Sequence, residues 1–60
     1  MKAWELEENI EYVAYNRFNQ KDRYKLLDGI LHIYNYYACS WFECDESFND
    51  IKNMKFDNYL

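Results

Sequence analysis

The chain has 60 residues, a formal net charge of −4 and an isoelectric point of about 4.7. This length allows one domain at most, and this charge argues against direct contact with nucleic acid or an anionic membrane, which both require Lys and Arg. No apolar run approaches the roughly 18 residues of a membrane helix and no signal-peptide pattern opens the chain, so we expect a cytoplasmic protein, in the host cytoplasm if the gene is viral.

The first predicted element is a helix over about residues 3–18. Its apolar side chains, among them Leu6, Ile10 and Val13, recur at helical spacing. Its first half, where the helix dipole favours negative charge, carries four carboxylates: Glu5, Glu7, Glu8 and Glu11. The Asn-Gln-Lys-Asp sequence of residues 19–22 is typical of a turn with end caps, so we expect the next helix to run antiparallel to the first.

The second predicted element is a longer helix over about residues 22–42. Polar positions step by four, three, four and three residues, as on one helix face: Lys21, Lys25, Asp28, His32 and Asn35. Residues 30–39 do not alternate cleanly between apolar and polar, as a half-buried strand would. The Asp28-Gly29 dipeptide also occurs in hairpin turns, but the periodicity favours Gly29 inside the helix, at a cost of about 1 kcal/mol, or a kink there.

The last third predicts a break around residues 44–47 and then a short helix over about residues 46–55. The sequences of residues 40–43 (Ser-Trp-Phe-Glu) and 47–50 (Ser-Phe-Asn-Asp) both match a helix-capping pattern, and Asp45 is a further candidate cap. Phe48, Ile51 and Met54 form a thin apolar stripe. The predicted fold class is therefore all-α: an antiparallel helical hairpin plus a short third helix, forming a small bundle that dimerisation could complete.

Aromatic residues make up 22% of the chain, which is unusually rich. Either the rings fill a small core, or there are more of them than 60 residues can bury. Tyr and Trp are enriched at binding hot spots. We therefore expect Trp4, Tyr12, Trp41 and Phe42 to anchor a partner, together with Tyr36, which lies off the main apolar stripe of the predicted helix.

The carboxylates form two groups, one in the first predicted helix and one near the second break. An antiparallel hairpin would bring both groups to one end of the molecule, with the basic residues around the turn at the other end. The acidic residues concerned are Glu5, Glu7, Glu8, Glu11, Glu43, Asp45, Glu46 and Asp50, and the basic ones are Arg17, Lys21, Arg23 and Lys25. An acidic patch bordered by Trp4, Trp41 and Phe42 would suit a basic protein surface. If its carboxylates took the place of phosphates in a basic groove, the protein would act as a mimic of DNA.

Catalytic and metal-binding chemistry is poorly represented. His32, Cys39 and Cys44 are the only soft metal ligands, and a continuous helix would hold His32 and Cys39 two turns apart. No glycine-rich phosphate loop or nucleophile motif occurs. We therefore predict no catalytic residue, metal or cofactor, and we expect both thiols to be reduced.

The sequence thus predicts a non-catalytic, acidic protein-binding module. Its expected role is that of an inhibitor or regulator that occupies a functional surface of a larger, nucleic-acid-handling host protein. Asn, Lys, Tyr, Phe, Ile and Met supply 29 of the 60 residues, which indicates an AT-rich genome such as that of many phages. The alternatives are a self-assembling homodimer or larger oligomer with an aromatic interface, and a small metal or redox protein.

Overall fold

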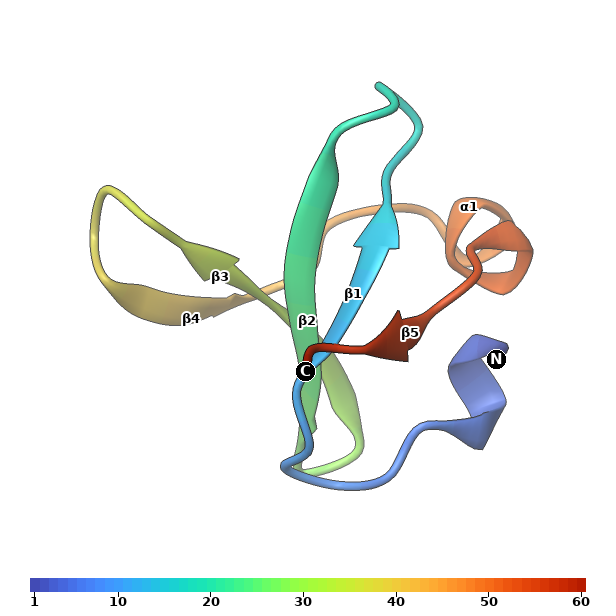
Figure 1. Cartoon of the computed structure of the whole chain (residues 1–60), viewed down its shortest axis with the longest axis horizontal. Coiled ribbons are helices and arrows are strands. Elements are labelled where there is room, and N and C mark those ends of the chain that lie inside the picture. The colour runs from blue at the N-terminus through green and yellow to red at the C-terminus, as the bar shows by residue number, and fades with distance from the viewer.

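A computed structural model describes all 60 residues and shows a five-stranded antiparallel β-sheet with short helical segments (Figure 1). The strands are β1 (Tyr12–Tyr15), β2 (Lys21–Leu27), β3 (Ile30–Asn35), β4 (Ser40–Glu43) and β5 (Asp57–Asn58), in the spatial order β4-β3-β2-β1-β5. A 3-10 turn, η1 (Ala3–Glu5), precedes β1, and a six-residue helix, α1 (Phe48–Asn53), lies between β4 and β5. No helix is long and apolar enough to cross a membrane.

The predicted all-α bundle is therefore wrong. The segments expected as helices over about residues 3–18 and 22–42 form strands and turns, apart from η1. The one α-helix, α1, lies within the third predicted helix. Ser47 caps it as the sequence pattern indicates, because its Oγ accepts a hydrogen bond of 3.2 Å from the amide of Asp50.

Residues other than glycine supply most of the tight turns. Asn9, Asn19, Asp28 and Cys39 all adopt a positive φ, between 52° and 63°, and Gly29 adopts 74°. Asn and Asp tolerate this left-handed region better than other side chains, because their short polar groups bond locally. A chain with a single glycine can therefore still form a sheet of short hairpins.

The β2–β3 hairpin turns on Asp28-Gly29, the dipeptide that helical periodicity placed inside a helix. Leu27 pairs with Ile30, so the loop has two residues, and both take the positive φ that a type I′ turn requires. The carboxylate of Glu8 accepts hydrogen bonds from the amides of Asp28 and Gly29, the latter at 3.0 Å. This contact ties the N-terminal segment to the end of the hairpin.

Asparagine side chains close the other two hairpins. Asn16 Oδ1 accepts hydrogen bonds from the amides of Phe18 (2.9 Å) and Gln20 (3.0 Å) in the β1–β2 turn. Asn35 Oδ1 accepts one from the amide of Tyr37 (2.9 Å) in the β3–β4 turn. In the β1–β2 turn these side-chain bonds add to backbone bonds between residues 16 and 20, and such local bonds favour a turn over continued helix.

The inner face of the sheet forms a small core with η1, α1 and the segment before β5. Its buried members are Leu6, Tyr12, Ala14, Tyr24, Met54 and Phe56. The rings of Tyr24 and Phe56 meet edge to face, with centroids 5.6 Å apart. The N-terminal ammonium of Met1 donates to Phe56 O (2.6 Å), and Phe56 N donates to Met1 O (2.7 Å). The start of the chain is thus joined to the segment that leads into β5.

Candidate functional site

The outer face of the sheet, opposite the core, carries a cluster of aromatic rings around one arginine. Side chains alternate between faces along a strand, so the burial of Tyr24 on the inner face sends Arg23 and Lys25 to the outer face. Tyr34 and Trp41 are cross-strand partners of β3 and β4 on this outer face. We call the following residues the Arg23 cluster: Arg23, Tyr34, Tyr36, Trp41 and Tyr59.

The guanidinium of Arg23 lies between rings from four segments of the chain. Its central carbon is 4.5 Å from the ring centroid of Tyr34 and 4.4 Å from that of Tyr59. The centroids of Trp41 and Tyr36 are 5.8 Å and 6.0 Å away. All four distances fall within about 6 Å, the range in which a cation is attracted by the face of a ring.

Glu11 fixes the position of the arginine. Its Oε1 accepts a hydrogen bond of 2.8 Å from Arg23 Nη2, and the two side chains are only 31% and 20% exposed. Burial lowers the pKa of Arg23, but the hydrogen bond and charge of Glu11 and a hydrogen bond with Tyr36 raise it, and the balance leaves the pKa above its ordinary value. The cluster therefore holds a permanent cation that is already paired within the chain.

The rings also support one another. Tyr34 meets Tyr36 and Trp41 edge to face, with centroids 5.0 Å and 5.2 Å apart, and Lys25 Nζ lies 4.5 Å from the centroid of Trp41. The cluster is therefore a second, smaller set of packed side chains, on the outer face. Tyr36 and Tyr59 nevertheless remain 59% and 42% exposed. Because these rings pack on Arg23 on one side and face solvent on the other, they form a rigid apolar surface.

The predicted aromatic anchors lie in different parts of the fold. Tyr36 and Trp41 belong to the Arg23 cluster. Phe42 pairs with Ile33, a residue of the inner face, yet it is 48% exposed because no element covers that end of the sheet. Tyr12 is only 2% exposed and belongs to the core, so it cannot contact a partner of the folded protein.

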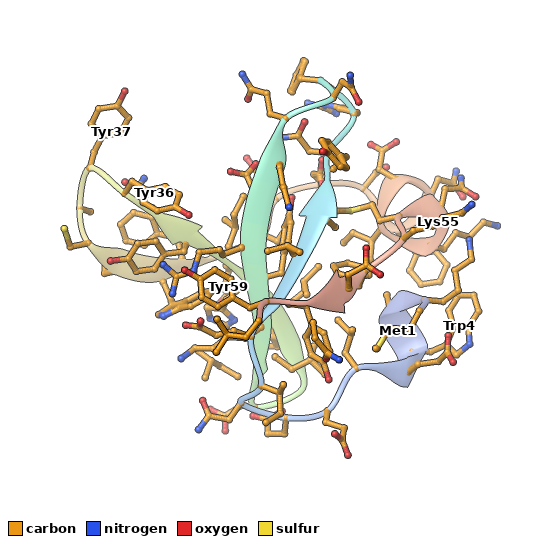
Figure 2. The ribbon with its side chains drawn as sticks, in the orientation of Figure 1. Met1, Trp4, Tyr36, Tyr37, Lys55 and Tyr59 are labelled. Atoms are coloured by element: carbon orange, nitrogen blue, oxygen red, sulfur yellow. The ribbon has the colours of Figure 1, made fainter.

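Trp4 lies well away from the cluster. It is 72% exposed on η1, and Figure 2 shows it beside α1, on the opposite side of the molecule from Tyr36. It borders an apolar groove of about 300 Å³ between η1, α1 and the β2–β3 turn. The groove is lined by Ala3, Trp4, Leu26, Gly29, Leu31, Phe48, Ile51 and Lys52.

The predicted separation of acidic and basic ends does not occur. Five of the eight expected carboxylates are engaged within the chain: Glu5 with the amide of Lys2 (2.7 Å), Glu8 with the β2–β3 turn, Glu11 with Arg23, Glu46 with the thiol of Cys44 (3.8 Å), and Asp50 with Arg17 (3.5 Å). Two of the four basic residues expected at the far end are thus paired with carboxylates of the expected acidic patch.

Glu8 of the first acidic group and residues 43–46 of the second also lie on opposite sides of the β2–β3 hairpin. Glu8 bridges to Leu26 of β2, and the amide of Cys44 donates to Leu31 of β3 at 2.9 Å. With strands about 4.8 Å apart, three spacings separate the backbone at Glu8 from the backbone at Cys44 by about 14 Å. The remaining three of the eight are exposed, and the hairpin separates the first of them from the other two; they are Glu7, Glu43 and Asp45.

The thiols show no catalytic or metal-binding arrangement. Cys39 is exposed and Cys44 is half-buried, and both are free. Burial raises the pKa of Cys44, and the charges of Glu46 and Asp45 raise it further, which makes it a weak nucleophile at neutral pH. No group of three or more His, Cys, Asp or Glu side chains is placed to hold a metal ion.

Three residues of the cluster were missed by the sequence reasoning: Arg23, Tyr34 and Tyr59. A signal for the first two exists in the sequence. If Asp28-Gly29 is taken as a two-residue hairpin loop, Leu27 pairs with Ile30. The same register, followed away from the loop, places Arg23 opposite Tyr34. No such local signal marks Tyr59, because it reaches the cluster through the packing of β5 on β1.

Comparisons with protein-family models, with curated proteins and with solved structures found no match to this chain.

Proposed function

We propose that the protein is a non-catalytic protein-binding module that contacts its partner through the Arg23 cluster. The observation that carries this proposal is the composition of the cluster, which consists only of Tyr, Trp and Arg, the residue types most enriched among binding hot spots. Tyr36 and Tyr59 keep much of their ring surface open to solvent. Covering that surface is favourable because apolar area leaves water.

Rigidity of the rings supports the same role. Binding normally costs about 0.5–1.5 kcal/mol for each long side chain that it immobilises. Tyr36 and Tyr59 already rest on Arg23, which Glu11 holds in place. Much of this ordering cost is therefore met when the protein folds, and more of the contact energy remains for affinity.

The charge of the protein bears on the choice of partner. A net charge of −4 favours approach to a protein with a basic surface, and the exposed carboxylates of Glu7, Glu43 and Asp45 contribute to this steering. The basic surface of a nucleic-acid-handling host protein suits such an acidic binder, which would then act as an inhibitor or regulator by occupying it. Mimicry of DNA receives less support, because five of the eight expected carboxylates are engaged within the chain.

Affinity capture tests the proposal. The immobilised protein is exposed to a lysate of a low-GC bacterial host and eluted with a salt gradient, and eluted proteins are identified by mass spectrometry. Three baits are compared: the wild type, the double variant Tyr36→Ser/Tyr59→Ser, and the matched control Trp4→Ser/Phe48→Ser, which removes two rings that are 72% and 79% exposed elsewhere.

We expect one dominant partner that is captured by the wild type and by the control but lost from the cluster variant. Retention of that partner by the cluster variant, or equal loss from both variants, would show that the outer face is not the contact surface. A further pair, Glu7→Lys/Asp45→Lys, separates steering from mimicry: it is expected to slow association without abolishing capture, whereas a mimic of DNA would lose its partner.

A further inference from the structure

Strand β4 is an open edge of the sheet. The strand order places it at one end, beside β3 only, and Figure 1 shows the β3–β4 hairpin extending away from α1 and η1. Its sequence, Ser-Trp-Phe-Glu, contains none of the Lys or Pro residues that commonly protect edge strands from pairing. The other edge, β5, has only two residues and offers little to pair with.

The register shows which backbone groups of β4 are free. Cys44 N donates to Leu31 O at 2.9 Å, which makes Leu31 and Cys44 a hydrogen-bonded position of the antiparallel ladder. Such positions alternate, so Ser40 and Phe42 also direct their backbone groups toward β3. The amide and carbonyl groups of Trp41 and Glu43 therefore point away from the sheet.

We propose that β4 pairs with β4 of a second copy of this chain, antiparallel and about a two-fold axis that passes between the two Phe42 residues. In this register Trp41 of each copy lies opposite Glu43 of the other, and the outward amides and carbonyls of both pairs form four backbone hydrogen bonds. The two five-stranded sheets then become one continuous sheet.

The side chains suit this register. Phe42 would face its own copy at a non-hydrogen-bonded position, where the two Cα atoms are about 4.5 Å apart and side chains are closest. The 48% of Phe42 that the monomer leaves exposed would be partly covered. Trp41 would face Glu43, so no like charges lie directly opposite each other.

A second copy fits this edge because the free backbone groups of β4 are self-complementary. Trp41 and Glu43 direct their amides and carbonyls outward on either side of Phe42. When a second β4 runs antiparallel about Phe42, its outward residues lie opposite these two. A domain with only six buried residues also gains from additional burial. Trp41 is the one member of the Arg23 cluster that belongs to β4, and the pairing is argued from the backbone of that strand, so this inference does not rest on the proposed function.

Sedimentation velocity over micromolar to millimolar concentrations tests the pairing. The wild type is expected to shift from its 7.5 kDa monomer mass toward twice that value, and to shift further at higher salt, because each copy carries a net charge of −4. Glu43→Pro removes an outward N–H without removing a bond to β3, so it is expected to stay monomeric with an unchanged circular dichroism spectrum. Glu43→Gln is the matched control, which keeps the amide and is expected to dimerise.

Amide hydrogen exchange of the wild type provides a readout that needs no variant. Exchange at Trp41 and Glu43 is expected to slow as concentration rises, while exchange at the turn residue Tyr37 is unchanged. A wild type that remains monomeric throughout would overturn the proposal and leave the edge to a foreign strand. Dimerisation of a folded Glu43→Pro variant would also overturn it, and so would a wild-type dimer in which the amides of Trp41 and Glu43 are not protected from exchange.

Discussion

The buried hydroxyl of Tyr24 has no hydrogen-bond partner, so removing it is expected to stabilise the protein. Tyr24 is fully buried at the centre of the core, where its ring meets Phe56. An unpaired buried polar group costs about 1–3 kcal/mol. Tyr24→Phe keeps the ring and deletes only the hydroxyl, so we expect a gain of about 1 kcal/mol or more in the free energy of unfolding, and about 4–8 °C in Tm for each kcal/mol.

Tyr12→Phe is the matched control, because the same atom is removed from a second buried tyrosine of the inner face. The hydroxyl of Tyr12 accepts a hydrogen bond of 3.0 Å from the amide of Glu7. Deleting it breaks that bond and leaves the amide unpaired, so we expect a loss of about 1 kcal/mol. The two substitutions are identical in chemistry and are predicted to have opposite signs.

The same hydroxyl shapes the alkaline stability. Burial, followed by the nearby charges of Glu46 and Asp22, raises the pKa of Tyr24 well above its ordinary value. In the unfolded chain a tyrosine ionises near pH 10, so above about pH 10 the unfolded state holds fewer protons than the folded state. Below that pH the hydroxyl is protonated in both states, so its ionisation does not affect the free energy of unfolding. Above it, the free energy of unfolding falls by up to about 1.4 kcal/mol per pH unit. Tyr24→Phe is expected to remove this part of the alkaline loss.

Urea and thermal unfolding followed by circular dichroism, at neutral pH and across the range above pH 9, measure both effects. If Tyr24→Phe destabilises the protein as much as Tyr12→Phe does, then the hydroxyl of Tyr24 is paired and the reasoning fails. An alkaline stability profile of Tyr24→Phe that matches the wild type would contradict the assigned ionisation.

The remaining predictions concern the ion pair and the thiols. A double-mutant cycle of Arg23→Met and Glu11→Gln is expected to give a coupling free energy of about 1 kcal/mol in urea unfolding, because the pair is partly buried and hydrogen-bonded; zero coupling would show that the pair does not hold the cluster. Cys39→Asn is expected to raise the free energy of unfolding by up to about 1 kcal/mol, since Cys39 occupies a φ of 52° that Asn adopts more readily; an unchanged Tm would argue against that turn geometry. Cys39 is expected to react with a thiol reagent well before Cys44, whose pKa burial raises, and equal rates would contradict the placement of Cys44 against the core.

The failure of the helical prediction has a physical cause in β2 and β3. A half-buried strand alternates between apolar and polar side chains, but here both faces of the sheet carry apolar or aromatic groups. Leu31 and Ile33 pack toward the core, while Ile30 and Tyr34 lie on the outer face with Arg23. The alternation is therefore hidden, and polar residues at steps of three and four follow a helical period by coincidence.

The turns explain the rest of that failure. One glycine and no proline in 60 residues would favour helices over hairpins, yet Asn19, Asp28 and Cys39 supply the positive φ that the hairpins need. A window over residues 30–39 also crosses the end of β3 and the loop after it, so it mixes two structures. Only the short cap at Ser47 could be placed, because capping depends on four adjacent residues and not on long-range pairing.

The aromatic part of the site was easier to predict than its acidic part. The residue type of Trp41, and the position of Tyr36 off the main apolar stripe of the predicted helix, mark both as candidate anchors, and both lie in the Arg23 cluster. The carboxylates were grouped by the geometry of an antiparallel helical hairpin. Once that geometry is replaced by a sheet, Glu8 and Glu11 become structural contacts of a turn and of Arg23.

Proton NMR of the free protein tests most directly whether the Arg23 cluster is preformed. With the guanidinium 4.5 Å and 4.4 Å from the ring centroids of Tyr34 and Tyr59, the side-chain protons of Arg23 are expected to shift upfield and to give nuclear Overhauser effects to both rings. Random-coil shifts for Arg23 and no such effects would show that the rings are not held together before binding, and would remove the basis for a rigid contact surface on this sheet.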